Sequence, residues 1–205
     1  MMMRRRLILY FLALGMFFSA SSCSVIQTFQ NIARLKFKLD SVNGFLLNGI
    51  SVANKTRLQD FSASDLLSLT SAVASKKLPL SFVLNVDAVN PNDGKGSNPK
   101  TDVQLTKFPW KLFIDDKETI TGDITSPISV PGMGQDVKFP LKIELDLFKF
   151  FNDRDYQGLV NLALKLSGQQ SNPVSIKLVA RPSVSSPIGD ITYPGDLTIV
   201  SQEYR

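Results

Sequence analysis

Three acidic residues close together in the chain are the first candidates for chemistry. Asp115, Asp116 and Glu118 lie within the segment LFIDDKETITG. Two carboxyl groups that face each other across a pocket are what glycoside hydrolysis requires. This segment, however, has the pattern of a β-hairpin, which places the acids at an exposed tip with no enclosed environment to keep one carboxyl protonated. We therefore interpret them as solvated turn residues.

Oxygen ligands also gather in the loop NPNDGKGSNPKTD. Asn92, Asp93 and Asp102 could in principle hold Ca²⁺, but the loop lacks the closing glutamate and the spacing of an EF-hand. Clusters of glycine, asparagine and aspartate are typical of turns, so a solvated loop is the favoured interpretation. Trp110 has two interpretations as well: it could be a platform for a ligand, whereas a lone tryptophan on an alternating apolar face is more often part of the core.

Histidine is absent from the chain, and cysteine occurs once. Catalytic Ser-His-Asp and Cys-His arrangements and histidine-containing zinc sites are thereby excluded, since each needs an imidazole. The single cysteine cannot form an internal disulfide. A lysine nucleophile or a carboxylate pair stays open on paper, but no set of reactive groups converges in the sequence. We therefore expect no enzymatic activity, no metal and no cofactor, and we identify no small-molecule substrate.

The composition is typical of a folded protein whose core needs no disulfide. The 205 residues are 43% hydrophobic and 20% charged. The formal charge is +5, but Arg4, Arg5 and Arg6 belong to a segment that we expect to be removed, which leaves 20 basic and 18 acidic residues and a charge of +2. The remaining lysines alternate with acids along strands. Nucleic acid is therefore not an expected partner, because phosphate binding needs a clustered basic surface.

Residues 1–22 have the layout of a secretory signal peptide, with three arginines, an apolar run from Leu7 to Phe18, and small residues before Cys23. The apolar run is about a dozen residues, shorter than the roughly 20 that a permanent transmembrane helix needs. The small residues Ala20-Ser21-Ser22 before Cys23 resemble the lipobox of bacterial lipoproteins, whose cysteine is lipidated and becomes the first mature residue. The lipobox usually has leucine where Ala20 stands. We expect Cys23 to be the lipidation site.

The lipobox resemblance also implies a location. It implies a diderm bacterium and, because Ser24 rather than aspartate follows the cysteine, a lipid anchor in the outer membrane. The acidic cluster that sends some lipoproteins to the cell surface is missing from SVIQTFQNI, so we expect the protein to face the periplasm. Acyl chains supply about 0.8 kcal/mol per buried methylene, so the folded part need not touch lipid. Two alternatives stay open: cleavage after Ser22 that leaves a free periplasmic protein, and an uncleaved signal anchor.

Alternating apolar residues predict the strands that would position these groups. In LPLSFVLNVDAVNPN every second residue from Leu78 to Ala88 is apolar, which predicts a long half-buried strand that stops at Asn90-Pro91-Asn92. The segment VKFPLKIELDL alternates in the same way from Val137 to Leu147. Phe108-Pro109-Trp110 interrupts another alternating run, which indicates a bulge or an edge position. These patterns predict an all-β domain of antiparallel strands.

Two segments instead have a period near 3.6 and predict helices. Ser62 and Asp65 have the spacing of a capping box, and Pro79 is expected to stop the helix that they begin. Its buried stripe is predicted to consist of Leu66, Leu69 and Val73, and we expect this helix to cover one open end of a β sandwich.

The second helix is expected from about Asp155 to Leu166, with Gly168 near its C-terminal end.

The order of these elements resembles the late embryogenesis abundant type 2 family, also called the water stress and hypersensitive response domain. The segments that carry the resemblance are FVLNVDAVNPN (82–92), WKLFIDDKETITG (110–122) and ISVPGMGQDVKFPLKIEL (128–145). The resemblance implies an immunoglobulin-like or fibronectin type III-like antiparallel β sandwich with one or two short helices, folded in water. It implies no catalytic residues. Members of the family are linked to desiccation and other stress, and bacterial members are often lipoproteins.

The predicted organisation is therefore a signal peptide over residues 1–22, a lipidated N-terminus and tether over 23–33, and a late embryogenesis abundant type 2-like sandwich over 34–205. The predicted function is that of a lipid-anchored, non-enzymatic, periplasm-facing protein that binds or protects macromolecules under desiccation or osmotic stress. The expected partners are the membrane, through the lipid on Cys23, and an envelope protein. The alternative is a structural or assembly subunit of an outer-membrane complex, in which a sandwich edge pairs with a partner strand.

Overall fold

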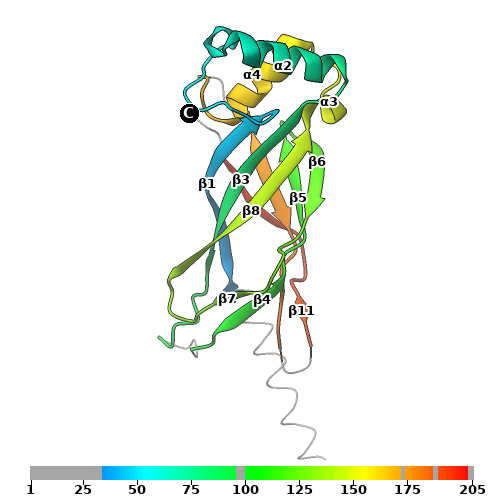
Figure 1. The fold of residues 1–205 in the computed structure, drawn as a ribbon. Helices are drawn as coiled ribbons and strands as arrows, with labels where there is room; N and C mark the ends of the chain where they lie inside the picture. The colour runs from blue at the N-terminus through cyan, green and yellow to red at the C-terminus, as the bar shows by residue number, and fades with distance from the viewer. Residues whose placement is uncertain (1–33, 96–99, 172–173, 187–188, 203–205) are drawn as a thin grey trace, which may run out of the picture.

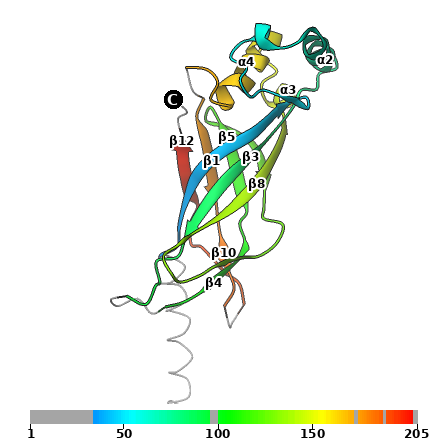
Figure 2. The same ribbon diagram turned by 60° about the vertical axis from the view of Figure 1, so that its left-hand side comes forward.

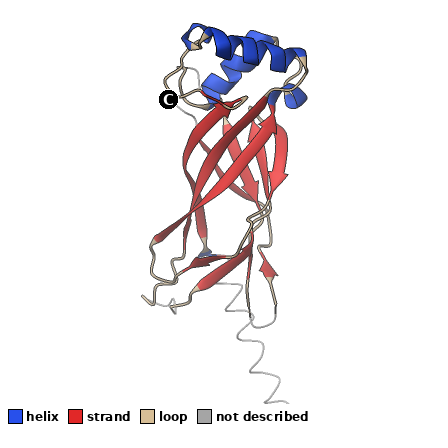
Figure 3. Ribbon diagram, viewed as in Figure 1, coloured by secondary structure: helices blue, strands red, loops and turns tan. Residues whose placement is uncertain are grey.

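A computed structural model describes residues 34–95, 100–171, 174–186 and 189–202. The predicted signal peptide, Cys23 and the tether lie outside the described residues. The described chain folds into an antiparallel β sandwich with helices gathered at one end, as Figures 1 and 3 show. This confirms the predicted all-β sandwich with short helices.

One layer of the sandwich is a four-stranded sheet, here called the front sheet, with the strand order β2-β1-β3-β8. Every neighbouring pair in it is antiparallel. Its long strands alternate between buried and outward residues, as their sequences predict. The strands are β1 (Lys36–Leu47), β2 (Ile50–Ser51), β3 (Pro79–Val89) and β8 (Asp136–Asp146).

The other layer consists of two four-stranded sheets. The upper sheet, next to the helices, has the order β12-β9-β5-β6, and the lower sheet has the order β11-β10-β4-β7. The upper strands are β5 (Trp110–Ile114), β6 (Lys117–Gly122), β9 (Ile176–Ala180) and β12 (Leu197–Gln202). The lower strands are β4 (Val103–Lys107), β7 (Ile128–Val130), β10 (Ser183–Val184) and β11 (Ile191–Thr192).

Each of the four chain passages between the upper and lower sheets contains a proline, namely Pro109, Pro127, Pro182 or Pro194. Proline has no N–H to give to a ladder, so a row of prolines separates the layer into two sheets. A hydrogen bond still joins two of these passages at the break: Arg181 N, between β9 and β10, donates to Pro109 O, between β4 and β5 (3.0 Å).

The interruption at Phe108-Pro109-Trp110 therefore has a different cause from the edge position that its sequence suggested. β5 lies between β9 and β6, in the middle of the upper sheet. Phe108, fully buried at the break, packs edge-on against Phe139 of the front sheet with ring centroids 5.2 Å apart. The break thus turns an aromatic ring into the core between the two layers.

The helices cover the upper end of the sandwich, as Figure 2 also shows. They are α2 (Ala63–Ala74), α3 (Leu147–Phe150) and α4 (Tyr156–Leu166), preceded by a short 3₁₀ turn, η1 (Leu58–Asp60). α4 begins with Asp155 as its N-cap and buries six residues, so it forms the centre of this cap. Both longer helices lie where the sequence predicts them, whereas the four-residue α3 was not expected.

The predicted buried stripe of α2 is only partly correct. Ser62 and Asp65 do form the capping box, but Leu69 is the one fully buried residue of this helix, and Leu66 and Val73 are half-buried. Leu67 is 73% exposed. The helix also ends at Ala74, before Pro79, which is the first residue of β3.

Asn90 joins the ends of several strands at the lower end of the molecule. Its side-chain Nδ2 donates to the backbone oxygens of Thr101 (2.8 Å) and Val130 (3.0 Å), and its Oδ1 accepts from Asn92 Nδ2 (2.8 Å). Its own backbone oxygen accepts from Gly134 N (3.2 Å). Asn90 and Asn92 are fully buried. This set of bonds, here called the Asn90 junction, connects the end of β3 to the start of β4 and to the segment between β7 and β8.

We predict that Asn90→Ala destabilises the protein strongly. The substitution leaves two carbonyl oxygens without their donor, and a buried polar group without a partner costs about 1–3 kcal/mol. A loss on the order of 3 kcal/mol in the free energy of unfolding is expected in urea denaturation. Asn152→Ala, at an exposed asparagine, is the matched control and should change this quantity by less than about 0.5 kcal/mol. Equal, small effects of the two substitutions would contradict the role given to Asn90.

Candidate functional site

Trp110 is an aromatic residue that lines two hollows in the surface of the protein. It is 6% exposed, so the prediction that it belongs to the core is correct. It also lines two hollows, one on each side of the segment that leads from β6 to β7. Its Nε1 is buried and has no acceptor among the described residues. Of the two alternatives that the sequence offered, core and ligand platform, the burial of Trp110 supports the core.

Gly122 lets the indole of Trp110 lie across β6. The two residues are paired between β5 and β6, and a Cβ at Gly122 would come within 2.3 Å of Cζ2 of the ring. Real Cβ atoms do not approach other atoms so closely, so this position accepts only glycine while the ring stays in place. β6 is the edge strand of the upper sheet, so the indole lies over the strand that borders the open side of the sandwich, between β6 and β8.

A groove of about 350 Å³ lies on that open side. One wall is β8, which contributes the buried side chains Phe139 and Leu141. The other wall is the 123–128 segment, which contributes the half-buried Ile124 and Ile128. Trp110 is part of the lining between them. The groove between these two edges of the sandwich is here called the Trp110 groove.

The second hollow, of about 590 Å³, is lined by residues of β5, β6 and β9 in the upper sheet. Its lining includes Val179 and Ala180, and charged side chains stand beside them. Arg181 Nε lies 2.9 Å from Asp196 Oδ1, so these two charges neutralise each other. Lys111, which also lines this hollow, lies 3.4 Å from Glu118.

Asp123 borders both hollows, yet its carboxylate already has hydrogen-bond donors. Asp123 Oδ1 accepts from the backbone N of Phe108 (2.6 Å) and of Ile124 (2.7 Å). These bonds connect the start of the 123–128 segment to the break beside β5. We therefore assign Asp123 a positioning role.

The acids at the hairpin tip each have a separate basic partner and do not face one another across a pocket. Asp115 and Asp116 form a two-residue turn with positive φ angles of 55° and 61°, which confirms the predicted turn. Asp116 and Glu118 are exposed. The ion pairs are Asp115 with Arg154 (3.4 Å), Asp116 with Lys177 (3.1 Å) and Glu118 with Lys111 (3.4 Å).

The oxygen ligands of the 90–102 loop point to different partners. Asn92 Oδ1 accepts from Arg34 (3.3 Å), and Asp102 Oδ1 accepts from Gly132 N (2.8 Å). Asp93 accepts from the backbone of Lys95 (3.0 Å). Within residues 34–95, 100–171, 174–186 and 189–202, no group of three or more histidine, cysteine, aspartate or glutamate side chains could hold a metal ion.

A charge network on the outer face of the front sheet was not apparent in the sequence. Lys38 Nζ lies 3.3 Å from both Asp87 and Asp136, and Lys138 donates to Asp40 (2.6 Å). The hydrogen bond with Asp136 contributes most to raising the pKa of Lys38, and Lys138 correspondingly lowers the pKa of Asp40. Lys38, Asp87 and Lys138 are opposite one another on β1, β3 and β8, so the network connects these three strands in the observed register.

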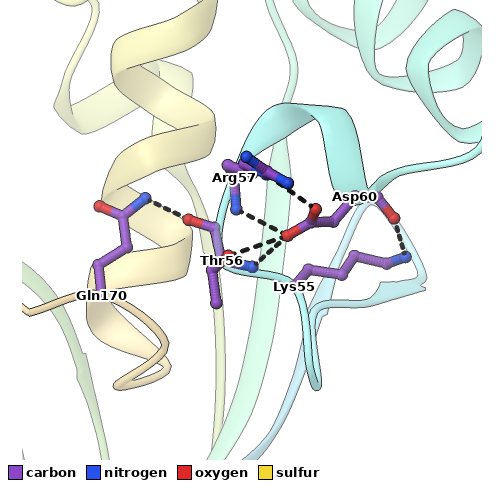
Figure 4. Close-up of polar contacts among 5 residues, drawn as sticks. All are labelled: Lys55, Thr56, Arg57, Asp60 and Gln170. Carbon is purple, nitrogen blue, oxygen red and sulfur yellow. Dashed lines mark hydrogen bonds and ion pairs between the residues drawn. The ribbon is translucent and has the colours of Figure 1, made fainter.

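Asp60 organises a second polar cluster, drawn in Figure 4. Its Oδ2 accepts from the backbone N of Thr56 (2.8 Å) and from the Thr56 hydroxyl (3.0 Å), and its Oδ1 lies 3.2 Å from Arg57 Nε. Gln170, just after α4, donates to Thr56 O (2.9 Å). The cluster therefore fastens the loop before α2 to the end of α4. A threonine followed four residues later by an aspartate was the available signal in the sequence.

We expect the acid stability of the protein to reflect Asp60. The backbone N–H of Thr56, followed by its hydroxyl, lowers the pKa of Asp60 to about 2. Since the folded pKa lies below the ordinary value, the stabilisation by the carboxylate is complete above about pH 4 and is lost as pH falls toward 2. The difference in Tm between the wild type and Asp60→Asn should therefore shrink across this interval. Asp153→Asn, at an exposed aspartate, is the control, and an Asp60→Asn difference that stays constant from pH 6 to 2 would contradict the assignment.

A double-mutant cycle tests the contact between Trp110 and Gly122. Gly122→Ala should lower the free energy of unfolding by about 1–3 kcal/mol, because the new methyl overlaps the ring. Trp110→Phe removes the ring atoms that the methyl meets. In the Trp110→Phe background, Gly122→Ala should therefore cost at least about 0.5 kcal/mol less. Additive effects in urea denaturation would show that the indole does not lie over Gly122.

The fold and the site define the class of this protein as an antiparallel β sandwich with a helical cap and an aromatic groove on its open side. No family model matches the chain, and no curated protein matches it. A crystal structure of a protein from Archaeoglobus fulgidus is similar over 81% of this chain and 98% of its own, at 9% identity and a TM-score of 0.37. A solution structure provisionally assigned to the late embryogenesis abundant proteins is similar over 89% of this chain and 87% of its own, at 16% identity and a TM-score of 0.38.

Proposed function

We propose that this chain is a non-enzymatic, lipid-anchored protein of the bacterial outer membrane that faces the periplasm and binds or protects other macromolecules under desiccation or osmotic stress. Support comes from the signal-like N-terminus with small residues before Cys23 and from the three segments that resemble the late embryogenesis abundant type 2 family. The β sandwich with short helices agrees with the fold that this resemblance implies.

The observation that carries the proposal is that the chain enters the sandwich at one end of the molecule and the helices cover the other end. β1 begins at the lower end, where Arg34 donates to Asn92 of the Asn90 junction, and the helical cap lies at the opposite end, as Figure 1 shows. The eleven residues 23–33 precede this point in the chain. An extended chain spans at most about 3.3–3.6 Å per residue, so a lipid on Cys23 holds the lower end within about 40 Å of the membrane.

The cap is then the part of the molecule presented to the periplasm. α2 contributes an exposed face of serine, threonine and alanine residues around Leu67, and its single acidic residue, Asp65, is engaged in the capping box. The described helices offer no segment long and apolar enough to cross a membrane. This arrangement suits a domain that meets soluble or wall-associated macromolecules while its anchor stays in the lipid.

The alternative function, a subunit of an assembly, requires an edge strand of the sandwich that can pair with a strand of a partner, and β8 is one of its edge strands. It is the edge strand of the front sheet and is eleven residues long, but Pro140 stands at its centre. Lys138, Lys142 and Glu144 along the same strand are exposed. A proline and charged side chains on an edge are the features that prevent pairing with another chain. They favour the binding or protective role over strand addition at this edge.

Cys23→Ala tests the anchor. The variant should leave the membrane fraction and appear in the soluble periplasmic fraction, because the sulfur that carries the acyl chains is missing. Fractionation of the cell envelope, followed by detection of the protein, measures the distribution. Gln27→Ala, in the same segment, is the matched control and should stay in the membrane fraction. Unchanged membrane partition of Cys23→Ala would contradict the lipid anchor.

A further inference from the structure

We propose that the Trp110 groove binds an acyl chain that carries a carboxyl or ester group, such as a fatty acid. This inference concerns the side of the sandwich between β6 and β8, and it holds whether or not Cys23 is lipidated. Three properties of the groove support it: apolar side chains on both walls, a buried donor and a rim cation; among the described residues the donor has no acceptor and the cation no ion-pair partner.

The walls of the groove are suited to a hydrocarbon chain. Phe139 and Leu141 face inward from β8, and Ile124 and Ile128 face them from the opposite wall. The groove volume of about 350 Å³ lies at the lower end of the range typical of ligand sites. Ile124 and Ile128 are half-buried, so an alkyl chain that covers their exposed surface gains free energy by binding there.

Trp110 supplies the hydrogen-bond donor. Its indole is held over Gly122 and is part of the groove lining, and its buried Nε1 has no acceptor among the described residues. A buried donor without an acceptor is unfavourable. Trp110 Nε1 can donate only, so its complement is an acceptor oxygen at an otherwise apolar site. A carbonyl or carboxylate oxygen at the end of an alkyl chain is such an acceptor.

Lys142 supplies the charge. It lines the groove from the exposed side of β8, and none of the ion pairs among the described residues involves it. By contrast, Lys138 on the same strand pairs with Asp40. Asp123, the acid of the groove lining, already accepts two backbone N–H bonds. The ammonium of Lys142, which has no ion-pair partner among the described residues, is therefore available to an anionic head group.

Trp110 is the single tryptophan of the chain, so its fluorescence reports on this groove without labelling. The probes are decanoic acid, methyl decanoate and a decanoic acid brominated on its chain, since bromine quenches indole fluorescence on contact. The protein is the full chain carrying Cys23→Ala, so that no acyl chain of its own competes. We expect saturable quenching by the brominated acid and competition by the unlabelled acid, at concentrations below those at which the probes aggregate.

Matched variants locate the binding. Ile124→Asp adds a charge to the wall of the groove and should weaken binding about tenfold or more. Thr121→Asp adds the same charge to the other hollow and should leave binding unchanged. Lys142→Ala should weaken the binding of decanoic acid and leave the binding of methyl decanoate unchanged. If circular dichroism shows that Ile124→Asp does not fold, the result for Lys142→Ala, a substitution at an exposed residue, decides. A wild type with no saturable response to acid or ester would overturn the proposal. Binding that Thr121→Asp abolishes, or that neither Ile124→Asp nor Lys142→Ala changes, would also overturn it.

Discussion

The side-chain amide of Asn90 hydrogen-bonds to carbonyl oxygens of two other segments, 11 and 40 residues further along the chain, and the lower half of the sandwich depends on these bonds. Nδ2 donates to Thr101 O before β4 and to Val130 O at the end of β7. The bond to Val130 O is buried and the bond to Thr101 O is partly buried, so the Val130 carbonyl in particular has no ready substitute donor. Gly132 completes the packing, since a Cβ there would meet Asn92 O at 2.4 Å. β3 therefore ends where β4 begins and β7 ends, and the lower sheet is placed against the front sheet.

The segments that resemble the late embryogenesis abundant type 2 family contain residues of two contacts seen in the structure. FVLNVDAVNPN contains Asn90, and ISVPGMGQDVKFPLKIEL contains its partners Val130 and Gly134. WKLFIDDKETITG begins with Trp110 and ends with Gly122, the two residues that meet across β5 and β6. The segments thus contain residue types that two contacts require. The Asn90 junction stabilises the fold, and the contact between Trp110 and Gly122 shapes the groove.

Local patterns were sufficient to predict the long strands β3 and β8 and both longer helices. The apolar alternation of β3 and β8 matches their burial closely, and the Ser62 and Asp65 capping box starts α2 where expected. Elsewhere the outcome depended on tertiary contacts that no local pattern contains. Leu67 is exposed because α2 lies on the end of the sandwich and buries little of its surface. The four prolines at the break lie far apart in the sequence, so their shared role in separating the upper and lower sheets is visible only in the folded structure.

The candidate site was less predictable for the same reason. Trp110 was identified as a residue with two interpretations, but the groove beside it is built from β5, β8 and the 123–128 segment, which the sequence does not bring together. Gly122 was a usable signal in hindsight. A glycine in a predicted strand indicates that a neighbouring group approaches the backbone closely, and the structure shows this group to be the indole of Trp110.

The central claim is that the sandwich binds or protects macromolecules at the envelope under stress. The most direct measurement is mild cross-linking of intact cells, followed by purification of the protein and identification of its partners, with and without osmotic stress. Our account predicts many weak partners that are captured mainly under stress. One envelope protein captured in stoichiometric amount under both conditions would contradict it and would point to a subunit of a permanent assembly.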